Sequence, residues 1–399
     1  MLLTIFRTTY LKPEEIKTMI APKESSLKIV KEYLASFGVS EDNMKVSKFS
    51  DLITVTMDVK TANLALQTEF ALFRSVVRRD VVIPRITKPY YLPAEVAEVV
   101  SLVDDIMRFP AVRSSLRATT RSGAEAALSI VDDEYDSCGT KCNRFTTPAV
   151  LQSAYGYYSP LKSAAPGNSM SVAEFQFQYY DTTDLHDFGS ACIVTAKVDK
   201  TIGGNKPAFC TVLGGCVEAL LDIEYIEAVA NPIPLTVIYS PSYSLLNWVN
   251  QVISLPSPPL VNSVSYGNDE VQQTSPQYME SVNIRFMIAG ALGISILFAS
   301  GDQGVWGRSG VGKKFNPDFP ATSPYVTSVG GTDFAVRIPK QHGPAVGVAS
   351  LVYSLYHHGK RMLSKHTSTR HLKLTCYLVV HCITPLVVAT LISPYWEGK

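Results

Sequence analysis

Two acidic residues, Glu218 and Asp222, lie four residues apart in the segment GGCVEALLDIEYIEAV, residues 214 to 229. This segment has the apolar content of a helix, and four residues make just over one helical turn, so both carboxylates project from the same face. One interpretation is an acidic stripe in contact with water, completed by Glu224 and Glu227. The other is a catalytic pair, in which one carboxylate acts as a base and the other orients it or shares its proton.

A third acid, Asp302, follows the apolar strand ISILFAS in the stretch FASGDQG, residues 298 to 304. Functional groups in α/β sheets gather at the carboxyl ends of strands, and flanking glycines let a substrate backbone approach closely. The alternative is a turn aspartate that caps a local backbone group. SVSYGNDE, residues 263 to 270, is a second strand end with an acid beyond it, which indicates the same edge of a sheet.

The stretch GRSGVGKK, residues 307 to 314, nearly matches a phosphate-binding loop, but Lys314 occupies the position where such a loop needs a Mg²⁺-binding hydroxyl. The segment that follows, FNPDFPATSP, holds three prolines where a phosphate loop would open a helix. We therefore expect a glycine-rich surface loop and no nucleotide site.

Composition excludes several classes of function. The chain has 399 residues, of which 46% are hydrophobic, enough for sizeable cores, and its net charge of +1 argues against nucleic acid or a polyanion as the partner. The seven cysteines include no repeated CxxC pair, so neither a zinc module nor a full disulfide framework is expected, although Cys138 and Cys142 are spaced for a small disulfide loop. The N-terminus has no cleavable signal pattern.

The pattern of elements changes twice along the chain. Helix-like segments, among them a run through ANLALQTEFALF, accompany one alternating stretch, DLITVTMDV, and predict a small α+β unit that ends before a polar linker at about 114–143. Between 144 and 337, apolar strands alternate with helices, which predicts an α/β unit with a parallel sheet covered on both faces.

The last part of the chain, 338–399, differs from the rest and is expected to be disordered or membrane-seeking. Its segment 374–392 is almost wholly apolar and could just span a bilayer of roughly 30 Å. Pro385 disfavours an ordinary buried helix there, and His381 disfavours a lipid environment.

Taken together, the segments of this chain resemble the sedolisin family of serine peptidases, and most closely its tripeptidyl-peptidase branch. The resemblance implies an activation prodomain and linker at 1–140 and a partial subtilisin-like peptidase domain at 144–337. It also implies peptide or protein substrates and a lysosomal or extracellular location. The matching segments are TTPAVLQSAYG (146–156), SVAEFQFQYYDTTDL (171–185), VEALLDIEYI (217–226), VNSVSYGNDE (261–270), LFASGDQG (297–304) and FPATSPYVTSVGGTDF (319–334).

The same resemblance assigns roles to the three acids. It implies that Glu218 is the general base for a serine nucleophile, that Asp222 orients Glu218, and that Asp302 stabilises the oxyanion. An aspartic acid donates a hydrogen bond to an oxyanion only when it is protonated, so these roles imply acidic working conditions.

The chain also departs from the family. It contains no SGTSAS-type nucleophile motif after the VGGT strand, and the family's calcium site has no counterpart, so no cofactor is expected in it. We therefore expect a truncated chain that is inactive as a peptidase. The alternatives are a non-catalytic regulatory or binding protein that keeps the prodomain, and a membrane protein anchored by 374–392.

The division into two units predicts where the chain is cut first. Limited proteolysis should cleave within 114–143, because a polar stretch between two apolar-patterned units is accessible to a protease. Mass spectrometry of the fragments checks this expectation, and preferential cleavage within 170–300 would contradict it.

Overall fold

The computed structural model describes residues 10–74, 82–107, 109, 147–157, 163–210, 216–302, 304–309 and 314–330. The predicted linker at 114–143, with Cys138 and Cys142, and the tail at 338–399 therefore lie outside the described residues. Within the described ranges, no helix is both long and apolar enough to cross a membrane.

The chain divides into two compact units. One comprises the described part of 1–108 together with 274–293, and the other comprises the described parts of 109–273 and 294–366. Helix α9 (Pro276–Ala291) belongs to the first unit although it lies late in the sequence.

The first unit is a small α+β structure, as the sequence predicts. Two antiparallel strand pairs, β1 with β2 and β3 with β4, accompany its helices. Besides α9, the elements of this unit are, in chain order, α1 (Pro13–Ile20), α2 (Glu24–Ser36), η1 (Glu41–Asn43), β1 (Met44–Val46), β2 (Ile53–Val55), α3 (Val59–Ala65), β3 (Phe70–Arg74), β4 (Val82–Ile86) and α4 (Ala94–Ala97).

One expectation for this unit is wrong. The sequence pattern indicates a single helical run through ANLALQTEFALF, but α3 ends at Ala65 and β3 begins at Phe70. The strand is favoured because FALFR pairs along its whole length with VIPRI, a partner that helical periodicity does not reveal. The side chain of Asn63 also accepts a hydrogen bond from the Phe70 amide, which fixes the turn between helix and strand.

A buried ion pair brings α9 into the first unit. The Arg285 guanidinium lies 2.6 Å from the Asp51 carboxylate, and the two side chains are only 6% and 17% exposed. Nearby, Leu34, Val39 and Met44 form a small apolar core. The unit is therefore held by apolar packing and by one ion pair between residues far apart in the sequence.

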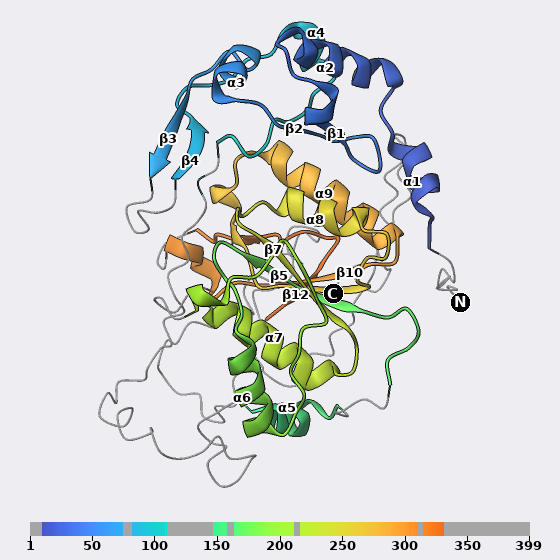
Figure 1. The fold of residues 1–399 in the computed structure, drawn as a ribbon, viewed down its shortest axis with the longest axis vertical. Coiled ribbons are helices and arrows are strands. Elements are labelled where there is room, and N and C mark those ends of the chain that lie inside the picture. Colours follow the sequence, from blue (N-terminus) through green and yellow to red (C-terminus); the bar gives the residue numbers. More distant parts are fainter. Residues whose placement is uncertain are drawn as a thin grey trace, which may run out of the picture. The chain divides into compact units, whose positions relative to one another are not determined.

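The second unit is built on a six-stranded parallel sheet with the strand order β12-β10-β8-β5-β7-β6 (Figure 1). This confirms the predicted α/β class. The elements are α5 (Pro148–Tyr155), β5 (Met170–Phe175), α6 (Thr182–Cys192), β6 (Lys200–Ile202), η2 (Pro207–Phe209), α7 (Val217–Ala230), β7 (Leu235–Ser240), α8 (Leu245–Ser254), β8 (Val261–Val264), β9 (Asn268–Asp269), η3 (Glu270–Gln272), β10 (Ser295–Ala299), η4 (Gly304–Ser309), β11 (Asp318–Phe319) and β12 (Thr327–Val329).

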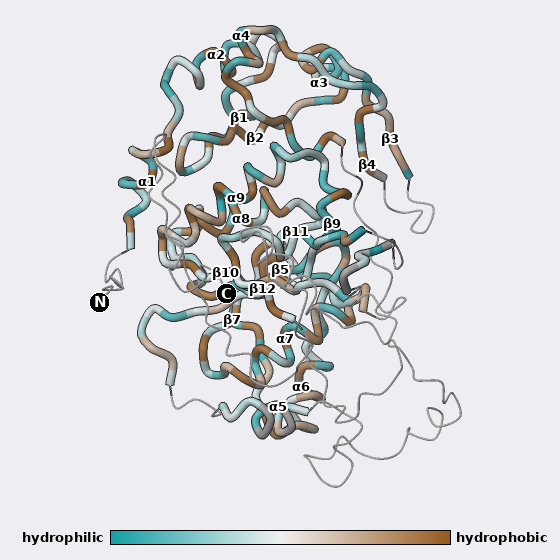
Figure 2. The backbone as a smooth tube through the Cα atoms, turned by 180° about the vertical axis from the view of Figure 1, so that it is seen from behind, coloured by the Kyte–Doolittle hydropathy of each residue, from teal (hydrophilic) through white to brown (hydrophobic). Residues whose placement is uncertain are grey.

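Helices cover both faces of this sheet. Leu185 of α6 and Ile223 of α7 pack with Val172 of β5 on one face, while Trp248 of α8 contacts Phe298 of β10 edge-on. Figure 1 shows α8 on the side opposite α6 and α7. All residues of β5 are buried, as expected for a central strand covered on both sides, and the tube is brown around β5 in Figure 2.

Two acids lie on the later turns of α7, and one of them is shielded from water. Glu227 is fully buried and accepts a hydrogen bond of 3.1 Å from Asn231. Burial raises the pKa of Glu227 to about 7, while the charge of Asp199 raises it further and that of Lys197 lowers it. Burial also raises the pKa of Glu224 to about 7, with a further contribution from Asp184. The acidic-stripe interpretation is thus wrong for Glu227.

These raised pKa values predict that the second unit is more stable in acid. Glu224 and Glu227 bind protons up to about pH 7 when folded but only up to their ordinary value of 4.5 when unfolded. The free energy of unfolding should therefore fall as the pH rises from 4.5 to 7. We expect thermal unfolding at a lower temperature at pH 7.5 than at pH 5, and a smaller difference in Glu227→Gln, which does not titrate.

A matched control is Glu280→Gln, the same substitution at an exposed helical position. It should leave the pH dependence of the unfolding temperature unchanged. An unchanged pH dependence in a Glu224→Gln, Glu227→Gln double variant would contradict the assignment.

Candidate active site

The candidate site lies at the carboxyl edge of the parallel sheet. β5, β8 and β10 are adjacent and parallel, so the loops that follow them leave the sheet at the same edge. Gln178 lies in the loop after β5, Ser265 directly follows β8, and Asp302 lies in the turn after β10. Helix α7 runs from β6 to β7, so its first turns also start from this edge.

The first turn of α7 is fixed by a disulfide and a side-chain amide. Cys216, the residue before the helix, is buried and forms a disulfide with Cys210. The backbone N–H of Glu218 donates to Oε1 of Gln178 at 3.2 Å, which satisfies one of the amides that a helix start leaves without an intrahelical acceptor. The first turn of α7, which begins at Val217 and carries Glu218, is therefore held at a defined place.

Aromatic side chains surround the disulfide. Tyr179, Cys216 and Tyr239 form a buried cluster. The hydroxyl of Tyr239 donates to that of Tyr179 at 2.8 Å and accepts from the backbone N–H of Phe177 at 3.3 Å. This cluster joins the loop after β5, the end of β7 and the start of α7, so the position of Glu218 depends on all three.

Asp222 is tied to the sheet by a serine. The hydroxyl of Ser265 donates to Oδ1 of Asp222 at 2.9 Å, across 43 positions of sequence. Asp222 and Glu218 are both half-buried, whereas Val217 and Leu221 beside them are 54% and 43% exposed. The pair thus lies where α7 meets the sheet edge, with Asp222 in contact with the β8 loop.

Aromatic residues also lie beneath this edge. Phe175, at the end of β5, makes edge-to-face contacts with Tyr243 and Tyr266. The Tyr266 hydroxyl donates to Oε2 of the fully buried Glu174 at 3.1 Å. The loops after β5, β7 and β8 are therefore packed together below the carboxylates.

Asp302 is exposed in the turn after β10. Gly301, which precedes it, has a φ of +87°, a backbone conformation that glycine adopts without steric cost. The structure places Asp302 at the same edge of the sheet as Glu218 and Asp222, on the loop of a different strand.

Sequence reasoning did not single out several residues of this site. Gln178 and Ser265 lie within the quoted segments SVAEFQFQYYDTTDL and VNSVSYGNDE, and Ser265 could have been noticed as a hydroxyl that directly follows an apolar strand. The Cys210–Cys216 disulfide was also missed; its only sequence signal is two cysteines before a helix start. Among the described residues, no group of three or more His, Cys, Asp or Glu is arranged to hold a metal ion.

Comparison with known proteins gives a consistent result for both parts of the chain. Residues 7–109 match the family described as Pro-kumamolisin, activation domain. The chain is 32% identical to tripeptidyl-peptidase 1 of Rattus norvegicus over 338 residues, which is 82% of this chain and 56% of that protein. It is 30% identical to tripeptidyl-peptidase 1 of Homo sapiens, with the same coverage. The chain therefore spans a little over half the length of these relatives.

Among solved structures, this chain is similar to Pseudomonas sedolisin, a serine-carboxyl proteinase, in a complex with two molecules of pseudo-iodotyrostatin. The TM-score is 0.37 at 23% identity, with coverage of 46% of this chain and 53% of that chain.

The disulfide should control the order of the first turns of α7. Replacing Cys210 and Cys216 by alanine removes a short cross-link, which is worth about 2 kcal/mol of unfolding free energy by loop entropy. We expect a lower unfolding temperature and faster amide hydrogen exchange over 217–222. Mass spectrometry of exchanged peptides measures this, and the matched control is Cys192→Ala, the same substitution at a cysteine outside the Cys210–Cys216 disulfide. Equal exchange over 217–222 in the two variants would contradict the assignment.

Proposed function

Because this chain belongs to the sedolisin family of serine peptidases, close to tripeptidyl-peptidase 1, we propose that its carboxyl-edge site serves peptide-bond hydrolysis at acidic pH. Glu218 is the general base, Asp222 orients it, and Asp302 donates a hydrogen bond to the oxyanion. The observation that carries this proposal is the hydrogen bond from Ser265 to Asp222. It ties the acidic helix to the sheet edge at which Asp302 also lies.

The proposed roles of the three acids follow from the position and contacts of each one. A base must lie where a nucleophile can reach it, and the half-buried Glu218 sits on the first turn of α7 beside exposed apolar residues. Asp222 already accepts a hydrogen bond from Ser265, which fixes its carboxyl group and suits it to orient Glu218. Asp302 is exposed on a separate loop, where an acid can donate to an oxygen that develops negative charge.

Acidic conditions fit two further features. A carboxyl group must carry a proton to donate to an oxyanion, which acid favours, and in acid the raised pKa values of Glu224 and Glu227 favour the folded state. The Cys210–Cys216 disulfide is typical of an oxidising compartment. We therefore place the protein in a lysosomal or extracellular setting, with peptides or proteins as substrates.

The proposal assigns no nucleophile to this chain, because the sequence contains no SGTSAS-type motif. The chain as printed is accordingly proposed to be inactive, since loss of the nucleophile removes the covalent step. The absence of this motif also favours a second candidate, a regulatory or binding protein that acts through its activation domain.

The test compares two proteins between pH 3 and 7, on substrates for tripeptide release and for internal cleavage. One is the chain as printed, for which no hydrolysis is expected. The other is the chain continued after Phe334 by a sedolisin-family segment that carries an SGTSAS motif, for which hydrolysis at acidic pH is expected. In the continued chain, Glu218→Gln and Asp302→Asn should each lower kcat by at least ~100-fold.

The matched control is Glu280→Gln, at an exposed position on α9, which should leave kcat unchanged. Full activity in Glu218→Gln would contradict its role as base. Hydrolysis by the chain as printed would contradict the proposed inactivity, and no hydrolysis in the continued chain would favour the regulatory candidate.

A further inference from the structure

We infer that Arg308 is a positioning residue, which acts through Asp269 and Asp318 to fix the turn that carries Asp302. The functional meaning of this inference rests on the proposed role of Asp302 as oxyanion donor. That Arg308 holds this turn in place is argued from its contacts alone. Arg308 lies in the glycine-rich stretch that the sequence predicted to be a surface loop.

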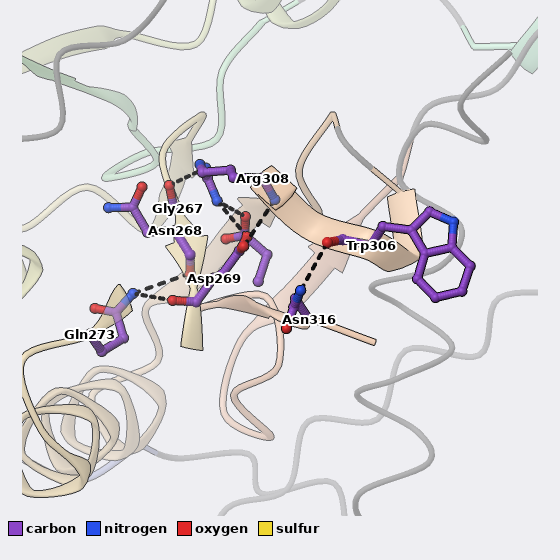
Figure 3. Close-up of polar contacts among 8 residues, drawn as sticks. Gly267, Asn268, Asp269, Gln273, Trp306, Arg308 and Asn316 are labelled. Carbon is purple, nitrogen blue, oxygen red and sulfur yellow. Dashed lines mark hydrogen bonds and ion pairs between the residues drawn. The ribbon is translucent and has the colours of Figure 1, made fainter. Parts of the chain in front are cut away.

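Arg308 is the centre of an ionic cluster (Figure 3). Its Nη1 donates to Oδ1 of Asp269 at 3.0 Å and to Oδ2 of Asp318 at 2.8 Å. Its Nη2 donates to the carbonyl oxygen of Gly267 at 2.6 Å, and its backbone N–H donates to Oδ2 of Asp269 at 2.9 Å. One residue therefore connects η4 to the loop after β8, to β9 and to β11.

The two aspartates of the cluster are buried. Asp269 and Asp318 are 3% and 4% exposed, and they face each other across the short antiparallel pair β9–β11. Two carboxylates at this depth repel each other and lose hydration, so they need a cation that binds both. The planar guanidinium of Arg308 donates in several directions at once, which a lysine ammonium cannot reproduce in the same geometry.

The backbone comes close to these same carboxylates at two glycines, Gly301 directly before Asp302 and Gly307 within η4. A Cβ atom placed on Gly301 would lie 3.0 Å from Oδ2 of Asp318, and one placed on Gly307 would lie 2.6 Å from Oδ2 of Asp269. Both glycines have positive φ, +87° and +58°, so the backbone turns sharply at each contact. The ionic cluster therefore contacts the backbone directly before Asp302 and again in η4, the next described element.

This arrangement differs from a cross-link that only adds stability. An ion pair that only adds stability would change the unfolding temperature and nothing at Asp302. The Arg285–Asp51 pair allows this comparison, because it is also a buried arginine–aspartate contact and both of its residues belong to the first unit. A substitution at Arg285 is therefore a matched control for the same substitution at Arg308.

The experiment uses the full chain and needs no enzymatic activity. Arg308→Lys keeps the charge but loses the forked donor geometry, and Arg285→Lys makes the same change in the other pair. The first readout is amide hydrogen exchange over 300–302. The second is the ¹³C chemical shift of the Asp302 carboxyl group at fixed pH, assigned with Asp302→Asn.

Arg308→Lys should speed exchange over 300–302 at least ~10-fold and move the carboxyl resonance of Asp302. Arg285→Lys should lower the unfolding temperature and leave both Asp302 readouts as in the parent chain. A lower unfolding temperature in Arg308→Lys with unchanged Asp302 readouts would overturn the inference.

If Arg308→Lys does not fold, Asp269→Asn replaces it as the test. This variant keeps the side-chain shape and the Arg308–Asp318 contact, and unchanged Asp302 readouts in it would overturn the inference equally. Because both readouts are independent of hydrolysis, this outcome is separate from the outcome of the activity test. Loss of activity in Asp302→Asn concerns the proposed function alone.

Discussion

The hydrogen bond between Ser265 and Asp222 is the contact on which the candidate site depends. Ser265 directly follows β8, a central strand of the sheet, and Asp222 lies on the helix that covers one face. Because α7 connects two parallel strands, its first turns must start at the carboxyl edge, where the loops after β5, β8 and β10 also emerge. A helix released from Ser265 would separate Glu218 and Asp222 from the edge that carries Asp302.

Buried acids in this protein are accommodated in two ways. Asp269 and Asp318 share a guanidinium, and Asp51 pairs with a second arginine in the other unit. Glu227 has an amide as its hydrogen-bond donor, and burial raises its pKa to about 7. The first arrangement fixes geometry through ion pairs, whereas the second favours the neutral acid and couples folding to pH.

The second unit contains acids paired with an arginine and acids with raised pKa values. The first turns of α7 carry Glu218 and Asp222 at the edge itself. The later turns carry Glu224 and Glu227, whose raised pKa values favour the neutral form in acid. The loop after β10 contacts the ionic cluster of Arg308. In the proposed function these features have separate tasks: reaction, stability at acidic pH and placement of Asp302. The match to the activation domain and the likeness to tripeptidyl-peptidase 1 are consistent with these tasks, while the proposed function assigns the nucleophile to no residue of this chain.

The sequence by itself determined the α/β class, most strands of the sheet, and the placement of Glu218 and Asp222 on one helix face. These follow from apolar periodicity and from the fixed pitch of a helix, which are local properties. It also placed Asp302 at a strand end. Only the tertiary structure decided which distant residues hold these acids: Gln178, Ser265, the Cys210–Cys216 disulfide and the Arg308 cluster. Such contacts depend on which strands become neighbours, and strand order is set by packing of the whole sheet, which no local pattern records.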